Sequence, residues 1–155
     1  MIPARWMPVL AVAIALLCQD IARAQGGNAC IISATGVSFG TYDVFGASPV
    51  DSTGSVTFAC GAAVRNITVT LSAGQGGSFS PRTLVKGIES LSYNLYTDAA
   101  RTAVWGNGTG GTQTYSNADP PNVTNIVLTI YGRIPASQDV SAGPYGDTVT
   151  ATVNF

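Results

Sequence analysis

The sequence contains no histidine, and only 10% of its 155 residues are charged. Without histidine the chain lacks the usual base of a Ser-His-Asp or Cys-His nucleophilic site. The net charge of −1 provides no basic surface for nucleic acid. There is no CxxC pair, and the few carboxylates are too dispersed to predict a zinc or calcium site. We therefore expect no enzyme activity, no catalytic residues, no metal and no cofactor.

Hydrophobic runs long enough to cross a membrane are also missing. The apolar run Val9–Leu17 is shorter than the roughly 20 residues that a membrane-spanning helix needs. Arg5 precedes this run, and the tripeptide ARA at 22–24 follows it as a small-x-small cleavage site. This pattern predicts a secretory signal peptide at 1–24 and one mature domain at 25–155, exported without a membrane span.

Cysteine is scarce, with three residues in the chain, and Cys18 lies in the predicted signal peptide. The remaining two, Cys30 and Cys60, form an even set in an exported protein, which predicts a disulfide. A closed loop of about 30 residues would stabilise the fold by roughly 3–4 kcal/mol in the chain-entropy model. Two free buried thiols are the alternative. Because Val56 and Phe58 share the alternating face of Cys60, we expect an internal bridge between the first two strands.

The sequence does have many glycines, threonines and short alternating segments. Apolar and polar residues alternate in Gly54–Cys60, Asn66–Leu71, Leu91–Tyr96 and Asn125–Ile134, as they do in half-buried strands. No segment keeps a helical period over three turns. Several short strands separated by glycine- and proline-rich turns predict an all-β fold, a sandwich of two sheets.

The C-terminal segment from Asp147 to Phe155 alternates cleanly between apolar and polar residues. Val149, Ala151, Val153 and Phe155 fall on one face, and three threonines and an asparagine fall on the other. This predicts a half-buried final strand. A sandwich normally follows such a strand with another one, so we expect the neighbouring strand to be missing. The four apolar residues would then line an open groove.

Two further features have ordinary structural explanations. Gly106–Gly111 (GNGTGG) matches the glycine pattern of dinucleotide-binding loops, but a polar loop follows it instead of a helix, so we expect a flexible loop. Arg133 lies at the end of a strong strand. We expect it to pair with Asp139 or Asp147 across the following loop, at about 0–1 kcal/mol if the pair is exposed.

The residues together resemble the spore coat protein U domain family, which includes subunits of archaic, Csu-type chaperone–usher pili. The resemblance runs from about Cys30 to Phe155. The most specific motif is Tyr131–Ala136 (YGRIPA) with Gln138, followed by Ala142-Gly143-x-Tyr145-x-Asp147-Thr148-Val149-Thr150 through Phe155. Supporting matches are Phe39-Gly40-x-Tyr42, Cys60, Leu95–Asp98 and Val104–Gly106 with Gly108 and Thr109.

The resemblance implies an incomplete immunoglobulin-like sandwich that lacks its last strand. In pili of this kind a periplasmic chaperone fills the gap first, and the N-terminal strand of a neighbouring subunit then replaces it. The expected function is therefore a structural subunit of a cell-surface fimbria with a role in adhesion or biofilm. Its expected partners are the chaperone, the usher and neighbouring subunits, and its expected location is the periplasm and then the cell surface.

The groove residues Val149, Ala151, Val153 and Phe155 would contact the donated strand. Covering about four apolar side chains at roughly 1.5–3 kcal/mol each gives about 6–12 kcal/mol. Whole domains are stable by only about 5–15 kcal/mol, so the uncapped domain should be marginal.

The residues before Cys30 depart from the pattern of polymerising subunits. After signal cleavage only Gln25–Ala29 (QGGNA) would precede Cys30, and this stub is short and does not alternate. We expect a chain that accepts a donor strand without supplying one, as in a terminal or tip position. The alternative is a self-contained secreted spore-coat or envelope protein.

Overall fold

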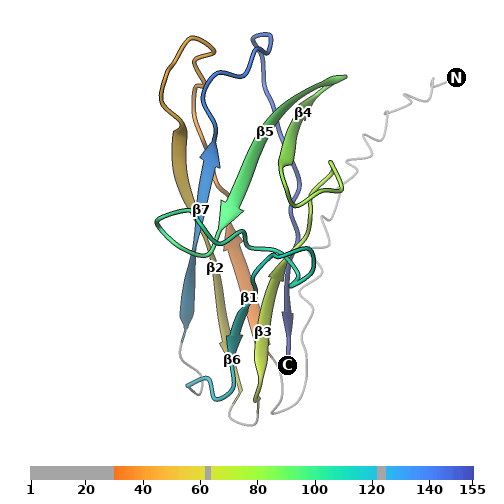
Figure 1. Ribbon diagram of the computed structural model, residues 1–155. Helices are drawn as coiled ribbons and strands as arrows, with labels where there is room; N and C mark the ends of the chain where they lie inside the picture. Colours follow the sequence, from red (N-terminus) through yellow and green to blue (C-terminus); the bar gives the residue numbers. More distant parts are fainter. Residues whose placement is uncertain (1–29, 62–63, 122–124) are drawn as a thin grey trace, which may run out of the picture.

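Eight strands form two antiparallel sheets in the computed structural model, which describes residues 30–61, 64–121 and 125–155 (Figure 1). The predicted signal peptide and the stub 25–29 lie outside the described residues. The five-stranded sheet has the order β1-β2-β7-β5-β4, and the three-stranded sheet has the order β6-β3-β8. The strands are β1 (Cys30–Thr35), β2 (Val50–Cys60), β3 (Ile67–Leu71), β4 (Arg82–Lys86), β5 (Glu89–Tyr96), β6 (Tyr115–Asn117), β7 (Ile126–Ile134) and β8 (Ala151–Asn154).

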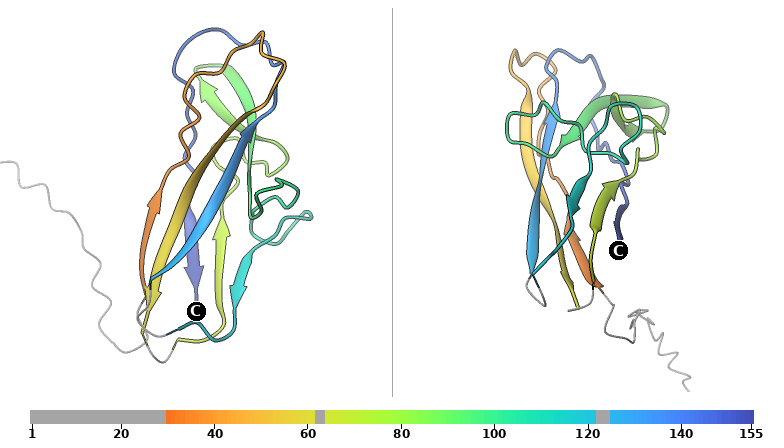
Figure 2. Two further views of the ribbon diagram at one scale, coloured as in Figure 1. Left: turned by 90° about the vertical axis from the view of Figure 1, so that its left-hand side faces the viewer. Right: turned by 60° about the horizontal axis from the view of Figure 1, so that its bottom comes forward.

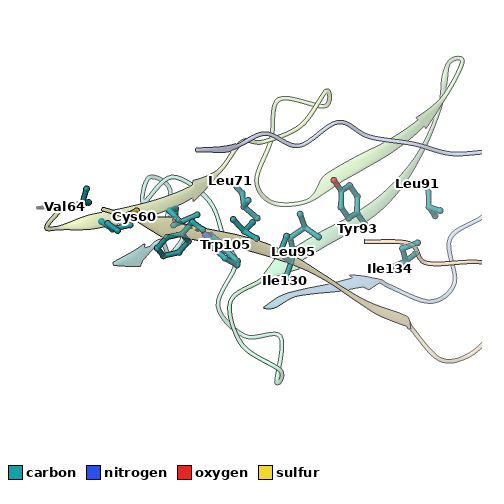
Figure 3. Close-up of a cluster of buried hydrophobic side chains, with 13 residues drawn as sticks. Cys60, Val64, Leu71, Leu91, Tyr93, Leu95, Trp105, Ile130 and Ile134 are labelled. Atoms are coloured by element: carbon teal, nitrogen blue, oxygen red, sulfur yellow. Dashed lines mark hydrogen bonds between the residues drawn. The ribbon is translucent and has the colours of Figure 1, made fainter. Parts of the chain in front are cut away.

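The predicted all-β sandwich is confirmed, and so are its inward faces. Alternate residues of β2, β3 and β5 point into one hydrophobic cluster between the two sheets (Figure 3). Within the described ranges no helix is long and apolar enough to span a bilayer. The cluster contains Val56, Phe58, Cys60, Val64, Ile67, Val69, Leu71, Leu91, Tyr93, Leu95, Trp105, Ile130 and Ile134.

The C-terminal segment differs from the prediction, because only Ala151–Asn154 is a strand. Just upstream, Gly146 exchanges two backbone hydrogen bonds with Val85 of β4, at 2.8 and 3.1 Å. The segment therefore starts at the edge of the five-stranded sheet and ends as β8 at the edge of the three-stranded sheet. Alternation in the sequence shows which face is buried, but it does not show which sheet provides the partner.

A buried arginine, Arg82 of β4, joins the two sheets. Arg82 is fully buried, and its guanidinium donates to Ser72 O at 2.8 and 3.1 Å. It also donates to Trp105 O at 2.7 Å and to Asn94 Oδ1 at 2.8 Å. Burial lowers the pKa of Arg82, and carbonyl and amide dipoles rather than a bonded carboxylate stabilise its charge.

Replacing Arg82 with leucine should destabilise the domain by about 3 kcal/mol or more. The variant leaves the carbonyls of Ser72 and Trp105 without their donor, at about 1–3 kcal/mol for each unsatisfied buried group. Urea unfolding would measure the loss of unfolding free energy as a lower midpoint, with an unchanged slope of free energy against urea concentration. Arg65, whose side chain is half exposed, is the control, and Arg65→Leu should stay within about 0.5 kcal/mol. Equal losses in both variants would contradict this assignment.

The predicted disulfide is present and holds β1 in place. Cys30 and Cys60 lie opposite each other in the β1–β2 ladder and are bonded. Among the described strands β1 pairs with β2 alone, and every β1 residue except Cys30 is exposed. With so few packing contacts, β1 depends on this covalent bond and on a single ladder of backbone hydrogen bonds.

The double variant Cys30→Ala, Cys60→Ala should lose about 2–5 kcal/mol of stability. Its local effect is more specific, because β1 should open before the core does. Hydrogen exchange should therefore show β1 amides losing protection more than the amides of β3, which lies between two neighbours. Equal protection of β1 and β3 in the double variant would show that the disulfide is not what retains β1.

Candidate functional site

The name lateral groove is used here for the side of the sandwich between residues 30–45 and 140–155, where an edge of one sheet lies near an edge of the other (Figure 2). The side formed by residues 30–45 begins with β1, and the side formed by residues 140–155 ends with β8 and Phe155. The two strands are edge strands of different sheets. In the described part of the chain no backbone ladder joins β1 to β8. Figure 2 shows the two strands near each other, with the C-terminus and the start of β1 at the same end.

The core-facing side of β1 is open to solvent. Ile32 lies opposite Phe58, and Ala34 lies opposite Val56, so each pair points to the same side of the sheet. Phe58 and Val56 are buried, whereas Ile32 is 43% exposed and Ala34 is also exposed. Side chains that face the interior thus lack cover along this edge.

β8 forms the other side of the groove. Val153 lies opposite Val69 and Ala151 lies opposite Leu71, and both partners are buried, so Ala151 and Val153 face the core. These two residues and Val149 are half-buried and pack against the core. Phe155 follows β8 and is 58% exposed. The structure therefore brings the predicted residues Val149, Ala151, Val153 and Phe155 to one side of the groove, and their binding role stays a prediction.

Away from the disulfide, a cavity of about 970 Å³ lies between residues 37–45 and 140–147. The core residues Leu91 and Ile134 and the half-buried Leu84 line it. Four aromatic residues also line it, namely Phe39, Tyr42, Phe45 and Tyr145. The sequence does not reveal this cavity, because its two sides are loops that come together only in the fold.

Asp147 fixes the start of the C-terminal segment at this cavity. Its Oδ2 accepts a hydrogen bond from the Tyr93 hydroxyl at 2.6 Å, and its Oδ1 accepts one from the Gln75 backbone amide at 2.7 Å. Burial, together with the bond to Asp147, raises the pKa of Tyr93, so the hydroxyl remains a donor.

The predicted ion pair of Arg133 with Asp139 or Asp147 is wrong. Arg133 binds both carboxylate oxygens of Asp51, at 2.7 and 2.8 Å. The β2–β7 register places these two residues directly opposite each other, which sequence distance alone does not reveal. The hydrogen bond from Arg133 lowers the pKa of Asp51.

A polar cluster around Glu89 holds the 141–145 side of the cavity against the β4–β5 hairpin. Glu89 Oε2 lies 2.8 Å from Lys86 Nζ, 2.5 Å from Ser141 Oγ and 3.1 Å from the Tyr145 hydroxyl. Lys86 also donates to Ser141 Oγ and Ala142 O. The hydrogen bonds from Lys86 and Ser141 lower the pKa of Glu89 to about 2.

Among the described residues no three His, Cys, Asp or Glu side chains come together as metal ligands. Gly106–Gly111 is a turn, in which Thr112 Oγ1 accepts from the Gly108 amide at 3.1 Å, and it precedes no helix. The predicted loop is confirmed at this position.

Comparisons with known proteins agree on one family. The Spore Coat Protein U domain matches residues 17–152. Protein U of Myxococcus xanthus is 34% identical over 151 residues, covering 85% of this chain and 80% of that protein.

Solved structures include pilus subunits. The crystal structure of the CsuC–CsuE chaperone–tip adhesion subunit pre-assembly complex, from archaic chaperone–usher Csu pili of Acinetobacter baumannii, matches 82% of this chain. The identity is 27% and the TM-score is 0.58. This chain spans only 40% of the matched chain, the subunit CsuE. A second match is the crystal structure of HdaB, the minor tip subunit of the E. coli Hda pilus. The match covers 79% of this chain and 79% of HdaB, at 16% identity and a TM-score of 0.40. Since the family match extends over most of the sequence, the chain belongs to the Spore Coat Protein U domain family.

Proposed function

We propose that this protein is a structural subunit of a cell-surface fimbria whose lateral groove accepts an extended strand from another polypeptide. The observation that carries the proposal is the exposed core-facing side of β1 beside the free edge of β8. In this proposal the immunoglobulin-like sandwich is incomplete, and the groove is the place of its missing strand. Similarity to a tip subunit that was crystallised with its chaperone supports the proposal.

The physical basis is strand addition to an open sheet edge. β8 has β3 on one side and no strand on its other side in the described residues, so the backbone groups on that side are available to an added strand. Neither β1 (CIISAT) nor β8 (ATVN) carries a charge that would discourage pairing. An added strand would also cover Ile32, Ala34 and Val153, at about 1.5–3 kcal/mol for each large aliphatic side chain.

The partners follow from the same geometry. A periplasmic chaperone would fill the groove first, and a strand of a neighbouring subunit would replace it at the usher. Export through the predicted signal peptide at 1–24 leads to the periplasm and then to the cell surface. The similarity to a tip subunit favours a tip position, with a role in adhesion or biofilm.

A second candidate function is a self-contained secreted coat protein. The 34% identity to Protein U over most of both chains favours it. In that case the domain would be stable alone and would not respond to an added strand. The two candidates therefore differ in one measurable property of the purified mature domain.

A synthetic peptide of alternating valine and threonine should raise the melting temperature of the purified domain by several degrees. At about 100 times the dissociation constant, binding adds about 2.7 kcal/mol of stability. Ala151→Asp places a charge on the core-facing side of β8 and should abolish the shift. Thr152→Asp, on the opposite exposed face, is the matched control and should keep it. A stable wild-type domain with no shift would favour the self-contained coat protein.

Acid should loosen the Glu89 cluster that borders the groove. Because the pKa of Glu89 is lowered from 4.5 to about 2, its contribution is present above about pH 4.5 and is lost as the pH falls towards 2. At about pH 6 the wild-type protein should therefore have a higher melting temperature than the Glu89→Gln variant. This difference in melting temperature should shrink by about pH 2.5. A difference in melting temperature that stays constant over this pH range would contradict the role of the Glu89 carboxylate.

A further inference from the structure

We propose that a second cavity, lined by β6 and β7, binds a short segment of a neutral saccharide. The cavity has a volume of about 450 Å³, and Thr97 and Trp105 line it together with residues of the two strands. β6 and β8 are opposite edges of the three-stranded sheet. The cavity therefore shares no lining residue with the lateral groove, and the inference does not depend on strand addition.

The cavity forms where the two sheets leave strand edges unpaired. β5 pairs with β7 only from Tyr131 to Arg133. Before Tyr131, β7 has β2 as its single neighbour among the described strands, and β6 likewise pairs with β3 alone. Backbone N–H and C=O groups along these two edges are therefore available to the hydroxyl groups of a ligand.

Hydroxyl groups make up most of the polar lining of this cavity. Within the described ranges, no protein group bonds to the side-chain hydroxyls of four lining residues, namely Thr114, Ser116, Thr129 and Tyr131. Two of them belong to β6 or the residue before it, and two belong to β7. Each hydroxyl can donate one hydrogen bond and accept others. A ligand that carries many hydroxyl groups can therefore be held from both sides at once.

Aromatic rings supply apolar contact in the same cavity. The Tyr115 ring packs edge-on against Phe58, with centroids 6.0 Å apart, and the Arg101 guanidinium lies 5.9 Å from the centroid of the Tyr131 ring. Trp105 is buried and its Nε1 donates to a backbone carbonyl, so it contributes apolar surface. A pyranose has C–H groups on its faces and hydroxyls around its rim, which matches a lining of rings and hydroxyls.

The charge of the lining selects a neutral ligand. No charged side chain lines the cavity in the part of the chain that the structure describes. Arg101, which packs on Tyr131, is paired with Asp51 at 3.2 Å. A carboxylated sugar would lose hydration here without gaining a counter-ion, whereas a neutral sugar avoids that cost. The volume falls within the range of about 300–1,000 Å³ that is typical of small-ligand sites.

Fluorescence of the purified mature domain tests the inference, because Trp105 is the only tryptophan in residues 25–155. The probes are neutral hexasaccharides of glucose, mannose and galactose, and the matching hexamers of their uronic acids. At least one neutral hexasaccharide should bind with a dissociation constant of about 1 mM or tighter. Its uronic acid counterpart should bind about tenfold more weakly or less. Isothermal titration calorimetry measures the same affinities without relying on Trp105 emission.

Variants that each remove one hydroxyl locate the site. Thr129→Val on β7 and Ser116→Ala on β6 should each weaken binding about two- to tenfold, and the double variant should weaken it by about tenfold or more. Thr35→Val is the matched control and should keep the wild-type affinity. It removes the same hydroxyl from the same face of the sheet, two strands away, because Thr35 and Thr129 both lie opposite Ser55. Melting temperatures show which variants fold, and either single variant suffices.

Each remaining outcome would overturn the inference. If no neutral hexasaccharide binds, the cavity is not a saccharide site. If the affinity survives in the folded cavity variants, or falls equally in Thr35→Val, the saccharide binds elsewhere. Equal affinity for the uronic acid hexamer would contradict selection of a neutral ligand. None of these results bears on the strand-accepting function, which the valine–threonine peptide tests separately.

Discussion

A sheet of three strands cannot cover a sheet of five, and this mismatch determines the rest of the structure. The buried faces of β2, β5 and β7 find partners in β3 and in the segments around Trp105. In the described residues no strand of the smaller sheet pairs with β1 or covers it, and Ile32 is 43% exposed although it points inward. Among the described strands β8 likewise has a single neighbour, β3. The groove is therefore a consequence of strand count rather than of any special residue.

The alternating segments made the core predictable from sequence. Ile67, Val69 and Leu71 face inward as expected, and so do Leu91, Tyr93 and Leu95, because burial of one face dictates a period of two. The disulfide could also be predicted from the sequence, because an exported chain with two cysteines outside the signal peptide has only one possible pairing. Such signals are local, and each one needs only a few neighbouring residues.

The features that sequence reasoning missed depend on long-range contacts. Arg82 looks like an ordinary surface residue, yet it is buried among carbonyl groups from three distant segments. The partner of Arg133 depends on strand register, and the cavity depends on two loops that meet only in three dimensions. β6, with three residues, is too short to leave a pattern. The candidate site was therefore predicted on its β8 side, whereas its β1 side and its deeper end were not.

The covalent link between β1 and β2 also sets the mechanical response of the domain. The cysteines are 30 positions apart, and their bond removes the intervening chain from any extension under tension. Fully stretched, a segment of this size would span about 100 Å. The disulfide therefore prevents the chain from lengthening by roughly that distance under tension. A fibre built from such domains would stretch less before rupture than one in which the same loop could unravel.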